Sequence, residues 1–146
     1  MSYKVGLMPC NGMSFIMSTV ARDVCHTVSE VLLPGKIYFI DTTCILAEVE
    51  EEMKIVQKIP ILVVDGCRLK CAAKALDKRR IIFHDLMIIT DIMQDNGLSL
   101  RGEDRNRLGR KGQSIVKITS REAAKRAARL LDSMRGNRST DRGDSR

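Results

Sequence analysis

The chain has 146 residues, of which 44% are apolar and only 3% aromatic, and it carries a formal net charge of +7. This length suits one domain with an aliphatic core, and no apolar run approaches the roughly 20 residues of a membrane-spanning helix. The first ten residues lack the pattern of a secretory signal, so we expect a cytoplasmic protein that does not enter a membrane.

Strand and helix patterns alternate through the first two thirds of the chain. Short apolar segments predict four strands, at residues 3–8, 36–42, 60–64 and, in one or two pieces, 81–89. Apolar residues at helical spacing predict helices between them, at residues 18–33, 45–58 and 67–78. This alternation is typical of right-handed βαβ units. It predicts an α/β fold with a small, open, mostly parallel sheet of about four strands and helices on both faces.

The last third of the chain has a different pattern. Residues 93–118 lose apolar periodicity and predict a loop or linker. Residues 119–136 predict a basic C-terminal helix with an N-cap near its start, and residues 137–146 predict a disordered tail. The α/β domain with its cysteines would therefore span residues 3–92.

The basic charge belongs to this C-terminal region alone. Residues 1–100 carry 11 basic and 12 acidic side chains, whereas residues 101–146 carry 14 and 6, a net charge of +8. Such a region could bind an acidic protein or an RNA through its cations. Against RNA, no aromatic residue beyond Phe83 is present to stack on a base, and a solvated helix and tail is the more common outcome.

Three of the five cysteines follow the ends of predicted strands, and a fourth lies one helical turn beyond the third of them. Cys10, Cys44 and Cys67 follow the first, second and third strands. Cys71 lies one helical turn after Cys67, on the same helix face. Because the carboxyl ends of parallel strands share one edge of a sheet, we expect these thiols to meet there. Four thiolates match the tetrahedral coordination of Zn²⁺, so the sequence predicts a zinc site made of Cys10, Cys44, Cys67 and Cys71.

Other chemistries remain open for the same thiols. An iron–sulfur cluster also takes four cysteine ligands. A predicted helix N-terminus at Cys67 would favour its thiolate, which makes Cys67 the candidate nucleophile of a thiol- or sulfur-transfer enzyme. Disulfides are not expected in a reducing compartment. We interpret Cys25 as a core residue because it lies on the apolar stripe of helix 18–33, and neither His26 nor His84 is predicted as a ligand.

Polar residues near these cysteines are candidates for supporting roles. Asp65 could cap the helix that follows it or orient a ligand. Asn11 and Ser14 are candidates to hydrogen-bond the sulfur atoms.

The segment Val-Val-Asp-Gly-Cys-Arg-Leu-Lys-Cys-Ala-Ala-Lys at residues 63–74 resembles the signature of the DGC-domain family. The chain also resembles the family in its Cys-x-Gly-x-Ser at residues 10–14, in Cys44 after the second strand, and in a Lys-rich helix after Cys71. Members are small proteins regarded as zinc-binding, with a largely uncharacterised function. The resemblance covers residues 3–92 and implies the same four cysteines as ligands.

Two departures from the family pattern affect the surroundings of the cysteines. Residues 15–17 are Phe-Ile-Met, and residues 45–47 are Ile-Leu-Ala, where the family pattern has smaller, glycine-containing segments. These bulkier residues predict a more apolar mouth to the site, either drier or capped.

Overall fold

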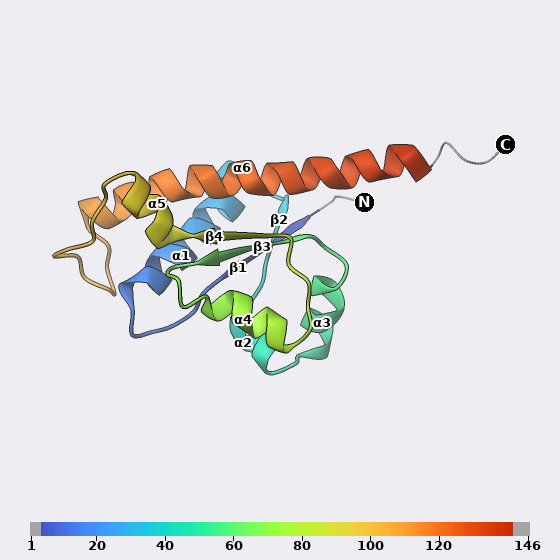
Figure 1. The fold of residues 1–146 in the computed structure, drawn as a ribbon, viewed down its shortest axis with the longest axis horizontal. Coiled ribbons are helices and arrows are strands. Elements are labelled where there is room, and N and C mark those ends of the chain that lie inside the picture. The colour runs from blue at the N-terminus through green and yellow to red at the C-terminus, as the bar shows by residue number, and fades with distance from the viewer. Residues whose placement is uncertain (1–3, 142–146) are drawn as a thin grey trace.

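The computed structural model describes residues 4–141, and its centre is a four-stranded, fully parallel sheet with strand order β2-β1-β3-β4 (Figure 1). In register, Leu7 of β1 lies opposite Phe39 of β2 on one side and opposite Leu62 of β3 on the other. Every residue of β1 and β3 is buried, as expected of strands covered on both faces. The strands are β1 (Val5–Pro9), β2 (Ile37–Phe39), β3 (Ile61–Asp65) and β4 (Asp85–Ile88).

Helices cover both faces of this sheet, which confirms the predicted α/β fold (Figure 1). One face carries α1 (Ile16–Thr27), its π-helical continuation η1 (Val28–Leu32) and the long helix α6 (Arg110–Asp141). The other carries α2 (Thr42–Leu46), α3 (Glu50–Val56) and α4 (Cys71–Lys78), while α5 (Ile89–Asp95) follows β4 directly. No helix within residues 4–141 is long and apolar enough to cross a membrane.

Two of the predicted helices have different boundaries, because single residues adopt left-handed backbone conformations. Glu48 has φ 54° and separates α2 from α3, so the predicted helix 45–58 is two short helices. Lys70 has φ 56° immediately before α4, so this helix begins at Cys71 rather than at Cys67. Neither residue is a glycine, and a side chain in this region costs free energy that the surrounding contacts must offset.

Helix α6 begins at Arg110, within the segment predicted as a loop, and continues through Asp141. Its buried face includes Thr119 and Ser120, and these polar residues interrupt the apolar periodicity that would have revealed the helix in the sequence. The Thr119 hydroxyl is satisfied inside the helix, because it donates a hydrogen bond to the Ile115 carbonyl at 2.6 Å. The predicted disordered tail is therefore helical up to residue 141, and residues 142–146 lie outside the described part of the chain.

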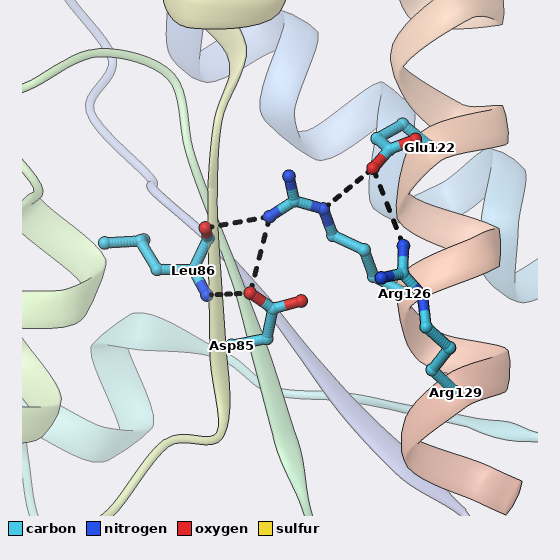
Figure 2. Close-up of polar contacts among 5 residues, drawn as sticks. All are labelled: Asp85, Leu86, Glu122, Arg126 and Arg129. Atoms are coloured by element: carbon cyan, nitrogen blue, oxygen red, sulfur yellow. Dashed lines mark hydrogen bonds and ion pairs between the residues drawn. The ribbon is translucent and has the colours of Figure 1, made fainter.

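Arg126 attaches α6 to the edge strand β4 (Figure 2). Its guanidinium donates to the Leu86 carbonyl at 3.0 Å and to the Asp85 carboxylate at 3.3 Å. Glu122, one turn earlier on α6, accepts from the same guanidinium at 3.0 Å. The long helix is thus fixed to the sheet by polar contacts at one edge as well as by its buried apolar face.

Candidate functional site

A pocket with a volume of about 440 Å³ lies beyond the carboxyl ends of β1 and β3. Strand β2 lies on one side of β1, whereas β3 and β4 lie on its other side, so the strand order changes direction between β1 and β3. Crevices at such switch points are the usual ligand sites of parallel sheets. Three of the predicted ligands line this pocket: Cys10 at the end of β1, and Cys67 and Cys71 after β3.

Cys10 forms the buried floor of the pocket, with 7% of its surface exposed. The backbone N–H of Gly66 donates to its Sγ at 3.2 Å, and the thiol contacts the Ser18 hydroxyl oxygen at 3.7 Å. Burial raises the pKa of the Cys10 thiol above its ordinary value, and the contacts with Gly66 and Ser18 oppose this effect. An N–H donor to sulfur is a typical supporting contact of a metal-bound thiolate.

The Asp65-Gly66-Cys67 motif has a separate structural role for each residue. The Asp65 carboxylate accepts hydrogen bonds from the backbone N–H groups of Ala72 at 2.9 Å and Ala73 at 3.1 Å, so it caps α4 from a buried position. Burial raises the pKa of Asp65, and these two bonds oppose the rise. Of the two roles considered for Asp65, the structure supports helix capping.

Gly66 is required by the close approach of the end of β3 to α1. A Cβ atom at this position would lie 2.7 Å from Met17 Cβ and 2.8 Å from the Met17 carbonyl oxygen. The absence of a side chain therefore allows the Gly66 N–H to reach Cys10. Cys67 then continues into the pocket wall.

Cys67 and Cys71 lie on either side of a turn rather than on one helix. The Lys70 N–H donates to the Cys67 carbonyl at 3.1 Å, and the left-handed Lys70 then starts α4 at Cys71. Cys67 is half-buried and Cys71 is exposed. The turn brings both residues to the same pocket, as predicted, although the helix N-terminus lies at Cys71 and not at Cys67.

Cys44 occupies a different environment from the other three. Its helical neighbours Thr43 and Leu46 line the pocket, whereas Cys44 itself interacts electrostatically with Tyr38 and Glu52. Desolvation, followed by the negative charges of Asp41 and Glu52, raises the pKa of its thiol. The structure thus brings three of the four predicted cysteines to one pocket, and Cys44 is not among the residues that line it.

The donor set fits a thiophilic metal in kind, because three thiols share one pocket and one of them receives an N–H hydrogen bond. In position the fit is incomplete. Among residues 4–141, no three His, Cys, Asp or Glu side chains are gathered closely enough to hold a metal ion as they stand. Holding one would require side-chain rotation, which the half-buried Cys67 and the exposed Cys71 can undergo more readily than the buried Cys10.

The remaining cysteine, Cys25, and the two histidines do not line the pocket. Cys25 is completely buried between α1 and the sheet, as predicted, and burial raises the pKa of its thiol. His84 accepts a hydrogen bond from the Ile61 N–H at 3.1 Å, at the amino end of β3 and so away from the pocket. His26, on α1, is exposed and lies beside Glu30 of η1.

The pocket walls include residues that the sequence did not single out. Ser18, rather than the predicted Asn11 or Ser14, contacts the Cys10 thiol, while the Asn11 side chain accepts from Arg22. Leu69 is 56% exposed and lines the pocket. The bulky segments noted in the sequence do contribute to the walls, through Phe15, Met17 and Leu46.

The fold and this pocket define a small parallel α/β protein with cysteines at the switch point of its sheet. A family model described as the DGC domain matches residues 6–111, and the chain belongs to this family. The match extends beyond the predicted domain boundary at residue 92, through the loop that leads into α6. A search of curated proteins and a search of solved structures each return no match.

Proposed function

We propose that this protein binds a zinc ion through the cysteines of the pocket, in a non-catalytic or metal-carrier role. The observation that carries the proposal is that Cys10, Cys67 and Cys71, from the ends of two adjacent strands, line one pocket. Zinc prefers sulfur and nitrogen donors, and closed structural sites commonly contain three or four cysteines.

Two features of the chain support this role for Cys10 in particular. Its sulfur already accepts an N–H hydrogen bond, which would stabilise the negative charge of a metal-bound thiolate. Its burial disfavours a free thiolate, so a cation would be needed to keep the sulfur ionised at neutral pH. When bound, zinc would supply charge neutralisation and would link the ends of β1 and β3 through their cysteines.

Cys44 is the remaining predicted ligand, and its role separates a four-cysteine site from a three-cysteine site. It belongs to the same short helix as three residues of the pocket wall, but Cys44 is not itself among the residues that line the pocket. A three-cysteine set would disfavour an iron–sulfur cluster, which normally takes four protein thiolates.

The test is metal and acid-labile sulfide analysis of the untagged full chain, purified without oxygen and dialysed. We expect one zinc per chain, retained in a Cys25→Ala control and lost in Cys10→Ser, Cys67→Ser and Cys71→Ser. Far-UV circular dichroism of each variant separates loss of metal from loss of fold. Zinc retained in Cys44→Ser would assign three cysteine ligands, and zinc lost would assign four.

Two other results would contradict the proposal. Iron with sulfide and a brown chromophore would identify an iron–sulfur protein. Protein without metal, with five titratable thiols and Cys67 alkylated much faster than the others, would support a thiol- or sulfur-transfer enzyme.

A further inference from the structure

Helix α6 carries a line of cations on the side that faces away from the sheet. Figure 1 shows α6 as one long helix that runs along the sheet. Five exposed cations recur along it at intervals of seven, four, four and four residues, and we call them the basic stripe: Arg110, Lys117, Arg121, Lys125 and Arg129. With about 3.6 residues per turn, these intervals keep the stripe on one side of the helix over a length of about 28 Å. The buried residues Thr119, Ala123 and Ala127 lie on the opposite side.

The charges of the basic stripe are largely unneutralised by the described part of the chain. Within residues 4–141, four of the five side chains form no ion pair or hydrogen bond, and the fifth, Arg129, lies 3.8 Å from Glu122. The Glu122 carboxylate already accepts a hydrogen bond from Arg126, which attaches α6 to the sheet edge. A row of cations without counter-charges creates a positive field that attracts an extended polyanion.

The surface beside the basic stripe is hollowed where α6 lies next to residues 92–99. One hollow of about 430 Å³ lies between α5 and α6, and Arg121 and Lys125 line it. A second hollow of about 390 Å³ lies beside the start of α6, and Arg110 lines it. Asp95 is the one acid in the lining of the first hollow that forms no ion pair within residues 4–141, so cations predominate in both hollows. Such a surface can receive phosphate groups that project from a rod-shaped polyanion.

The composition of this surface restricts the kind of partner. Within the described chain, none of the exposed large hydrophobic side chains lies on α6. Helices that bind membrane surfaces expose an apolar face, and protein interfaces usually have an apolar centre. No aromatic residue follows Phe83 in the sequence, so the bases of a single strand would have no ring to stack on. A double helix, whose bases are already stacked and whose phosphates lie outside, suits this surface best.

We infer that the basic stripe binds the phosphate backbone of double-stranded DNA. An α-helix with its side chains is about 10–12 Å across, and the major groove of B-form DNA, about 12 Å wide, admits it. The major groove of double-stranded RNA is too narrow to do so. Three of the five cations are arginines, whose forked guanidinium groups match phosphate oxygens. This activity is separate from the proposed metal site, which lies beyond the ends of β1 and β3.

The experiment follows the fluorescence anisotropy of a labelled DNA duplex of about 20 base pairs, titrated with the full chain at salt concentrations between about 50 and 200 mM. We expect affinity to fall as salt rises, because each neutralised phosphate releases a counterion. If all five cations reach phosphates, the logarithm of the association constant should fall with the logarithm of salt concentration with a slope of about −4. One strand of the duplex alone should bind more weakly.

Two double variants with the same net charge test where the DNA binds. Lys117→Gln with Lys125→Gln removes two charges from the basic stripe, so affinity should fall about tenfold or more at low salt and the slope should change by about two. The matched control is Lys58→Gln with Lys78→Gln, which removes two exposed lysines beside α3 and α4, on the other face of the sheet. This control should bind almost as well as the wild type. Far-UV circular dichroism checks that both variants fold.

Several results would overturn the inference. These are the absence of binding to the duplex at the lowest salt concentration, and equal weakening by the two double variants, which would show a response to net charge alone. Tighter binding to an RNA duplex of the same sequence would assign the surface to RNA. Displacement of the DNA by polyglutamate at an equal concentration of charges would assign it to an acidic protein. None of these results changes the outcome of the metal analysis, so the proposed function is tested separately.

Discussion

The cysteine pocket and helix α6 both lie against the same four-stranded sheet, but different kinds of contact hold them in place. At the cysteine edge, short-range backbone contacts hold the groups in place: the Gly66 N–H on the Cys10 sulfur, and the Asp65 carboxylate on the first turn of α4. Helix α6 is held by an extended buried face and by one long side chain, Arg126, whose ion pairs are partly exposed. The first arrangement has little tolerance for an added atom, and the second distributes its attachment over many residues.

Adding a single methyl group at Gly66 should have the largest effect on the stability of the fold. A Cβ atom there would overlap both the side chain and the backbone of Met17, and backbone atoms cannot rotate away. We expect Gly66→Ala to lower the free energy of unfolding by about 2 kcal/mol, because overpacking of this kind forces the chain to shift. Urea denaturation followed by circular dichroism measures it.

Gly136→Ala provides the control on α6. A Cβ atom at Gly136 meets nothing within 4 Å, and alanine favours the helix. This variant should unfold at the same or a slightly higher urea concentration. Equal destabilisation by the two substitutions would contradict the contrast between the two regions.

Removing the guanidinium of Arg126 should have a smaller effect, because α6 keeps its buried face (Figure 2). Arg126→Met retains much of the apolar stem but loses the bonds to Leu86, Asp85 and Glu122. The Arg126 side chain is 27% exposed and its ion pairs are screened by solvent, so we expect a loss of about 1 kcal/mol in the same urea assay.

Lys125→Met is the matched control for this helix. Lys125 is exposed, adjacent in the chain, and forms no ion pair within residues 4–141. Its substitution should leave stability nearly unchanged. High salt should narrow the difference between the Arg126 variant and the wild type, and a difference independent of salt would point to packing of the stem instead.

The same contrast explains which parts of the molecule could be predicted from the sequence. Strand ends are marked by a change from apolar residues to turn residues, so the placement of Cys10, Cys67 and Cys71 at one edge follows from the parallel-sheet rule. The position of Cys44 outside the pocket could not be predicted, because the strand-end rule does not say which residues of the short helix α2 line the pocket, and these include Thr43 and Leu46 but not Cys44. The start of α6 was hidden because its buried face contains Thr119 and Ser120.

The smallest expected effect on stability is that of Glu103 at the start of α6, and this effect depends on pH. The Glu103 carboxylate accepts hydrogen bonds from the N–H groups of Gly109 and Gly112, and these bonds lower the pKa of Glu103 below its ordinary value of 4.5. A lowered pKa in the folded state means that the ionised carboxylate stabilises the fold above the unfolded pKa. That contribution is lost as the pH falls through the folded pKa, below 4.5.

Glu103→Gln should therefore be less stable than the wild type at neutral pH. Its loss of stability should be smaller than that of Arg126→Met, since Glu103 lies in an accessible loop and its amide replacement can still accept one hydrogen bond. The thermal midpoints of the two proteins should converge as the pH is lowered below 4.5, where the wild-type carboxylate becomes protonated. Asp104→Asn removes the same charge from the next residue, whose side chain accepts from Asn106 and not from the start of α6. Parallel curves for Glu103→Gln and wild type at every pH would show that the Glu103 carboxylate does not stabilise the start of α6.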